Sequence, residues 1–250
     1  MLYNIKIYFL LYIIYSFLGY IAEVAYVSFH REKLTLSRGF FIGPVLPIYG
    51  AGALIITIFL NGYNDQILVL FILSTVLCTL LEYYTSLILE KVFKLRWWDY
   101  KDKKFDLNGR VCLENSLLFG LGGVIIIEFI NPIILNLLYP LPETIINIVV
   151  IITFTLYLLD LIVSTKTIFT LKDKLKKLGG RDSTHQIRLE VKEYLTSHSR
   201  LMKRLIKAFP NLVDLNKTFK IPKLEKYLLG RKGYREFNRK RKELKRKKKM

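Results

Sequence analysis

The residues in this chain best suited to chemistry are four carboxylates that interrupt long apolar runs. Glu23, Glu82, Glu128 and Asp160 each lie among Leu, Ile, Val, Phe and Tyr. A carboxylate at the centre of a membrane helix costs about 2.5–3.5 kcal/mol on insertion scales, so it normally faces other helices or water and serves a function. The pattern predicts a membrane protein with a polar, acidic interior. The structural alternative is that each acid bonds to a Ser, a Tyr or a neighbouring helix and serves only packing.

Three of these acids are predicted to share one depth. Counting at about 1.5 Å per residue places Glu23, Glu82 and Asp160 roughly 12, 13 and 15 Å from the same membrane boundary, with Glu128 deeper. Each of the three continues a stripe of polar or small residues at spacings of three and four, which fall on one helix face. If the stripes face inward, they line a polar seam.

The elements that must position these acids are five apolar segments. The chain has 250 residues, 52% of them hydrophobic, and a spanning helix needs about 20 mostly apolar residues. The candidate spans are residues 7–29, 40–60, 67–93, 115–139 and 145–169. The expected fold class is all-α: a polytopic membrane bundle of about five spans with a basic cytosolic C-terminal tail. The second candidate contains Gly43, Pro44, Pro47 and Gly50, so it is either complete or broken and partly re-entrant.

The charge is divided unevenly along the chain, which carries a formal +19 in total. Residues 1–170 hold 12 Lys/Arg and 12 Asp/Glu, whereas residues 171–250 hold 27 and 8. We therefore expect a transmembrane domain over 1–170 and a basic tail over 171–250, with an amphipathic helix at about 183–209 and a disordered Lys/Arg-rich end. The basic loops and the tail fall on one side of five spans. The positive-inside rule then puts the N-terminus outside and the C-terminus in the cytoplasm of a plasma membrane.

The same composition suggests which partners to expect. The tail is predicted to contact anionic lipid headgroups of the bilayer, and nucleic acid is less favoured because no RNA-binding module is present. Cys78 and Cys112 have no metal-site spacing, so no metal and no cofactor are expected. No P-loop of the G-x-x-x-x-G-K-[ST] type occurs, so ATP hydrolysis would require a separate ATPase subunit. A homo-oligomer is expected only by analogy with other transporters.

Two stretches are more particular than generic membrane sequence. They are residues 37–50 (SRGFFIGPVLPIYG), preceded by 16–23 (SFLGYIAE), and residues 81–113, which include LEYYTS, WWDY and NGRVCL. Together they resemble the CmpB-like ABC-transporter permeases, a family of bacterial integral membrane proteins. The resemblance covers about residues 10–130 and implies a transport permease. It places the family's motif on Glu23, Arg38, Gly39, Gly43, Pro44, Pro47, Tyr49, Gly50, Glu82, Trp98, Asp99, Tyr100, Gly109 and Arg110.

These residues allow two interpretations of the cytosolic rim. Arg38 and Arg110 could hold an anionic substrate or a lipid headgroup through their planar guanidinium groups. They could equally pair with Asp99, Asp106 or Glu23 and lock the loops, which we slightly prefer. Gly39 and Gly43 have the spacing of a small-xxx-small helix contact. The candidate cavity or substrate residues are Glu23, Glu82, Asp160, Glu128, Arg38, Arg110, Asp99 and Tyr49.

Three functions remain open from the sequence. The favoured one is a transport permease whose acidic polar cavity faces the cytosol. The second is a membrane-embedded enzyme acting on a lipid-linked or anionic substrate at the cytosolic face. No H-E-x-x-H or G-x-S-x-G motif supports that reading, and whether the chain is an enzyme stays undecided. The third is a non-catalytic membrane scaffold whose tail recruits partners.

Overall fold

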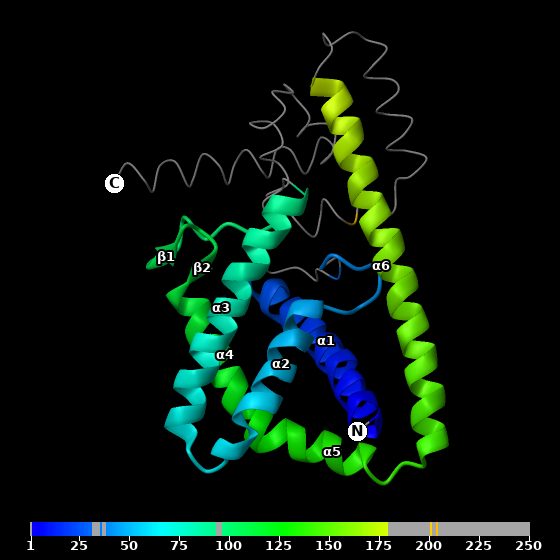
Figure 1. Ribbon diagram of the computed structural model, residues 1–250. Coiled ribbons are helices and arrows are strands. Elements are labelled where there is room, and N and C mark those ends of the chain that lie inside the picture. The colour runs from blue at the N-terminus through cyan, green and yellow to red at the C-terminus, as the bar shows by residue number, and fades with distance from the viewer. Residues whose placement is uncertain are drawn as a thin grey trace. The chain divides into compact units, whose positions relative to one another are not determined.

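Nearly all of the regular structure of this chain is helical. The computed structural model describes the backbone of residues 2–31, 36, 39–93, 97–179, 201 and 204. The chain divides into two compact units, Met1–Lys166 and Thr167–Met250, and the first unit is the one described below (Figure 1). The predicted amphipathic helix at 183–209 lies outside the described residues. The main helices are α1 (Leu2–Arg31), α2 (Pro47–Leu60), α3 (Ile67–Phe93), α4 (Leu113–Ile125), α5 (Asn131–Leu138) and α6 (Glu143–Gly179), the last of which continues into the second unit.

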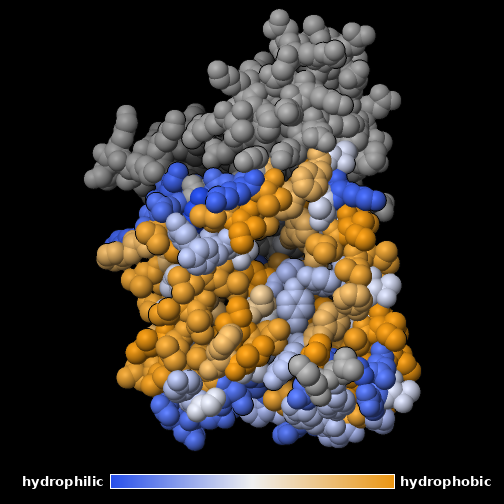
Figure 2. Space-filling model, viewed as in Figure 1, coloured by the Kyte–Doolittle hydropathy of each residue, from blue (hydrophilic) through white to orange (hydrophobic). Residues whose placement is uncertain are grey.

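The helices are long and apolar enough to cross a bilayer. Four candidate spans meet this test: Tyr3–Phe29, Ile67–Phe93, Leu113–Leu138 and Glu143–Thr170. Figure 2 shows hydrophobic side chains across the middle of the described helices and hydrophilic ones towards both ends. The expected all-α membrane bundle is confirmed, and the protein is a membrane protein.

Prolines fix where α2 begins. The expected second span covered residues 40–60, but its helix starts at Pro47 and has 14 residues. A residue that precedes a proline avoids the helical conformation, which applies to Gly43 and to Leu46 (φ −117°, ψ 96°). Residues 39–46 are accordingly non-helical, and α2 reaches only about 21 Å of a hydrocarbon core of about 30 Å. The helix contact expected from Gly39 and Gly43 is therefore wrong, because both residues precede the helix.

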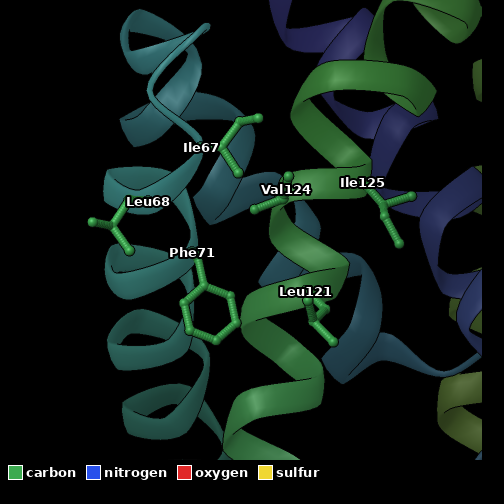
Figure 3. Close-up of a pocket in the computed structure, with 6 residues that line it drawn as sticks. All are labelled: Ile67, Leu68, Phe71, Leu121, Val124 and Ile125. Atoms are coloured by element: carbon green, nitrogen blue, oxygen red, sulfur yellow. The ribbon is translucent and has the colours of Figure 1, made fainter.

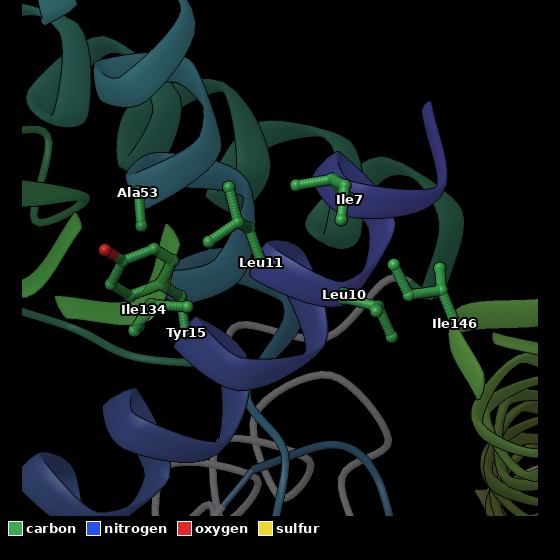
Figure 4. Packing of buried hydrophobic residues seen from close by; sticks show 7 residues of the cluster. All are labelled: Ile7, Leu10, Leu11, Tyr15, Ala53, Ile134 and Ile146. Atoms are coloured by element: carbon green, nitrogen blue, oxygen red, sulfur yellow. The ribbon is translucent and has the colours of Figure 1, made fainter. Parts of the chain in front are cut away.

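The start of α2 is inserted deep beside α1. The backbone N–H of Leu46 donates to the carbonyl of Ser16, near the middle of α1, at 2.9 Å. A Cβ at Gly50 would collide with the Ser16 Oγ and the Tyr12 carbonyl, so glycine is required for this contact. Further along, the side chains of Ile7, Leu10, Leu11, Tyr15, Ala53, Ile134 and Ile146 form one buried cluster that joins α1, α2, α5 and α6 (Figure 4).

A π-helix and a proline redirect the chain after α4. The π-helix η2 (Ile126–Ile130) follows α4, and Pro132 lies in the first turn of α5. Both features bend helices, and Figure 1 shows α5 turning away from α4 and passing across the end of the bundle. α4 and η2 together extend about 27 Å, enough to cross most of the hydrocarbon core without α5.

The two ends of the bundle differ in what they carry. At one end, called the basic end, α3 finishes, α4 begins, and residues 97–112 fold into a small hairpin cap. The cap contains strands β1 (Asp106–Leu107) and β2 (Val111–Cys112), which pair antiparallel with Asp106 opposite Cys112. At the opposite end lie the start of α1, the 3-10 helix η1 (Asn61–Tyr63) and the α5–α6 connection. There Lys6 forms an ion pair with Glu143 at 2.8 Å.

Candidate functional site

Glu23 and Glu82, from α1 and α3, come together beneath the hairpin cap. The Tyr49 hydroxyl, in the first turn of α2, donates to Glu23 Oε2 at 2.8 Å. The Tyr100 hydroxyl, from the cap, donates to Glu82 Oε1 at 3.0 Å. Tyr100 also interacts electrostatically with Glu23 and with Tyr49, which places all four side chains in one neighbourhood. We call Glu23, Tyr49, Glu82 and Tyr100 the acidic cluster.

Each tyrosine is positioned by a close backbone approach. Tyr49 packs its Cβ against Gly19 of α1, where any larger residue would collide with the ring. Tyr100 is held by its own backbone N–H, which donates to the carbonyl of Gly109 at 2.9 Å. The turn of the hairpin supplies that carbonyl, and its central residues Asn108 and Gly109 both have positive φ (56° and 66°). An Asn-Gly pair is the preferred sequence for such a turn.

The Tyr100 hydroxyl is a permanent donor at neutral pH. Burial, followed by the interaction with Glu82, holds the pKa of Tyr100 well above its usual range. A phenol with a raised pKa keeps its proton and donates it in a hydrogen bond. The cap therefore supplies the cluster with a neutral donor and no charge.

Glu82 has a buried carboxylate oxygen whose loss of water is not offset by a hydrogen bond from any described residue. It is 5% exposed, and its Oε2 has no hydrogen-bond partner among the described residues. Among the described residues, the groups that interact electrostatically with Glu82 are Glu23, Tyr100, Cys78 and Cys112, none of which carries a positive charge. A buried carboxylate oxygen with no partner is costly, so this atom is the best place in the described fold for a ligand or a proton.

Asp160 of α6 has different partners from the two glutamates. Its Oδ1 accepts from the backbone N–H of Ile42 at 2.8 Å, and its Oδ2 accepts from that of Gly43 at 2.7 Å. Ser164, one turn along α6, donates to Oδ1 at 2.8 Å. Non-helical backbone at membrane depth is tolerated only where its polar groups are satisfied. Asp160 performs this task for the segment before α2, and a cavity shared by all three acids stays a prediction.

The remaining candidate residues are placed apart from the cluster. Glu128 lies in η2, where its Oε1 accepts from the backbone N–H of Asp65 at 3.3 Å, at the opposite end of the bundle. Arg110 pairs with Glu90 at 2.7 Å, contacts the Ser86 hydroxyl, and lies 5.9 Å from the Tyr83 ring. Arg110 therefore pairs with a carboxylate, but the carboxylate is that of Glu90 and not one of the predicted partners.

The last two candidates are Asp99 and Arg38. Asp99 Oδ1 accepts from the backbone N–H of Lys101 at 3.3 Å within the cap. Arg38 lies outside the described residues.

Sequence reasoning missed a buried amide network in the other half of the bundle. Asn131 is 1% exposed; its Oδ1 accepts from the Tyr15 hydroxyl, and its Nδ2 donates to Thr57 Oγ1 at 3.0 Å. The network joins α1, α2 and α5 and is fully bonded, which suits polar packing between membrane helices. The signal in the sequence that could have revealed this network is Asn131, an amide next to Pro132 within an otherwise apolar run.

An apolar crevice between α3 and α4 is unsuitable for a polar solute. It has a volume of about 460 Å³ and is lined by Ile67, Leu68, Phe71, Leu121, Val124 and Ile125 (Figure 3). No lining side chain can pair with a charge or a hydrogen-bonding group. The acidic cluster therefore remains the candidate site.

Comparison with known proteins identifies the family. The family model described as "Putative ABC-transporter type IV" (CmpB) matches residues 10–165. The chain belongs to this family. The ABC-transporter type IV match extends past the expected 10–130 and takes in Glu23, Tyr49, Glu82, Tyr100 and Asp160 together. No curated protein and no solved structure matches the chain.

Proposed function

We propose that the chain is the membrane component of an ABC-type transporter and that its polar pathway runs through the acidic cluster. Membership of the ABC-transporter type IV family supports a transport role. The observation that carries the proposal is the pairing of Glu23 and Glu82 with tyrosine donors inside a membrane helical unit. Ionisable residues at such positions commonly mark solute or ion pathways.

The basic end is proposed to face the cytoplasm. Lys91, Lys101, Lys103 and Arg110 lie at this end, and cytoplasmic loops of membrane proteins carry an excess of Lys and Arg. In this orientation the hairpin cap and the acidic cluster lie nearer the side on which ATP is available. The basic tail would then contact anionic headgroups of the inner leaflet.

The proposal requires a separate ATP-hydrolysing partner, because the chain contains no P-loop. The full-length chain, tagged and purified from membranes of its own organism after mild crosslinking, should bring down an ATPase subunit. Glu82→Gln should leave this association intact, since Glu82 is buried beneath the cap. Purification that reproducibly yields the chain with no ATPase would overturn the assignment to an ABC-type transporter.

A further inference from the structure

We propose that the acidic cluster holds one exchangeable proton, bound at Oε2 of Glu82. The contacts of Glu82 support this proton whether or not the protein transports a solute. The idea that this proton takes part in the transport cycle rests on the function proposed above. The two claims are separable, because the proton can be observed in the protein whether or not it moves a solute.

The first step is the imbalance of charge around Glu82. Among the described residues, the titratable groups that interact with it are Glu23 on α1, Cys78 on its own helix, and Tyr100 and Cys112 from the cap. Each of these groups is either neutral or negatively charged, so none of them is a cation. A buried carboxylate with no cation among these groups takes up a proton, because burial disfavours the charged form.

The second step concerns the cation nearest along α3. Glu82, Ser86 and Glu90 follow one another at helical spacing, and Arg110 contacts Ser86 at 3.3 Å and pairs with Glu90 at 2.7 Å. The guanidinium is thus engaged one and two turns beyond Glu82 along the helix. Arg110 therefore neutralises Glu90 and not Glu82.

The third step decides which carboxylate oxygen carries the proton. Glu82 Oε1 already accepts the Tyr100 hydroxyl, whereas Oε2 is buried with no partner among the described residues. An ionised oxygen in that position bears the full desolvation cost, and a protonated one bears much less.

Infrared spectroscopy of the full-length protein in lipid bilayers tests the proposal directly. At neutral pH the wild type should show the carbonyl stretch of a protonated carboxylic acid, and D2O should shift that band downwards. The band should be lost in Glu82→Gln and kept in Glu128→Gln, the matched control at the opposite end. Tyr100→Phe should move it to higher frequency, because the carbonyl oxygen Oε1 loses a donor.

The infrared results test the proton at Glu82 independently of the proposed transport function. A band that survives in Glu82→Gln, or no protonated-acid band at neutral pH, overturns the proposal. If Glu82→Gln fails to fold, an unshifted carbonyl band in Tyr100→Phe also overturns the proposal. Failure to recover an ATPase would contradict the transporter assignment but would not change the infrared result.

Discussion

At the scale of single residues, three acids that look equivalent in sequence have distinct roles. Glu23 and Glu82 each accept a tyrosine hydroxyl, while Asp160 binds two successive backbone N–H groups. The helix position of each acid could be predicted from the apolar runs, but its partner could not. Tyr100 lies 18 residues from Glu82 in a loop, and only the fold of the hairpin cap brings the two side chains together.

Removing the charge of Asp160 should loosen the segment before α2. In Asp160→Asn one of the two acceptor oxygens becomes an NH2 group that faces a backbone N–H. Hydrogen bonds to charged groups contribute about 1.5–3 kcal/mol in soluble proteins, and polar contacts within membranes average about 0.6. We expect a loss of about 1–3 kcal/mol in the free energy of unfolding, measured by denaturant titration in micelles.

Glu143→Gln is the matched control for this substitution, because it makes the same change of group on the same helix. Glu143 forms an exposed ion pair with Lys6, and such pairs contribute little to stability because water and salt screen them. Equal losses in the two variants would show that Asp160 has no special role in holding residues 42 and 43.

At the scale of elements, the prolines and glycines carried more information than the hydrophobic pattern. The apolar run of 40–60 left open whether the second span is complete or broken, and Pro44 and Pro47 exclude a helix until residue 47. The Asn108-Gly109 pair was likewise a readable signal for the hairpin, although a run of charged residues around it suggested only a basic loop. The bend after α4 follows from Pro132, whereas the π-helix before it depends on packing and has no local signature.

Neighbouring glycines of α4 give a sharp test of the helix packing. A Cβ at Gly123 would collide with Ser74 of α3 and approach Ile56 of α2, whereas a Cβ at Gly122 meets nothing within 4 Å. We expect Gly123→Ala to lose about 1–3 kcal/mol of unfolding free energy by overpacking. Gly122→Ala should gain up to about 1 kcal/mol from the higher helix propensity of alanine. The same sign of change in both variants would contradict the packing of α4 against α3.

At the scale of the whole molecule, the fold class and the family could be predicted from the sequence. Long apolar runs set the membrane helices, and the motif residues predicted the family, because both signals are local in the chain. The roles of the individual charges could not be predicted, because they depend on which helix ends meet. The orientation in the bilayer is a prediction that rests on the distribution of Lys and Arg.

Labelling of single cysteines checks this orientation. In a background with Cys78 and Cys112 replaced by serine, we expect Gly62→Cys to react with an impermeant maleimide on intact cells. Lys101→Cys should react only after the membrane is opened, because the hairpin cap is proposed to face the cytoplasm. Both positions are exposed, so burial does not account for a difference. The reverse pattern would place the acidic cluster on the external side.

The central claim is that Glu82 belongs to a solute pathway, and the solute distribution of a deletion strain tests it most directly. Metabolites would be compared inside and outside cells that lack the chain and in cells that regain it as wild type, Glu82→Gln or Glu128→Gln, at equal membrane levels. The account predicts that wild type and Glu128→Gln restore the altered solute and that Glu82→Gln does not. Full restoration by Glu82→Gln would contradict it.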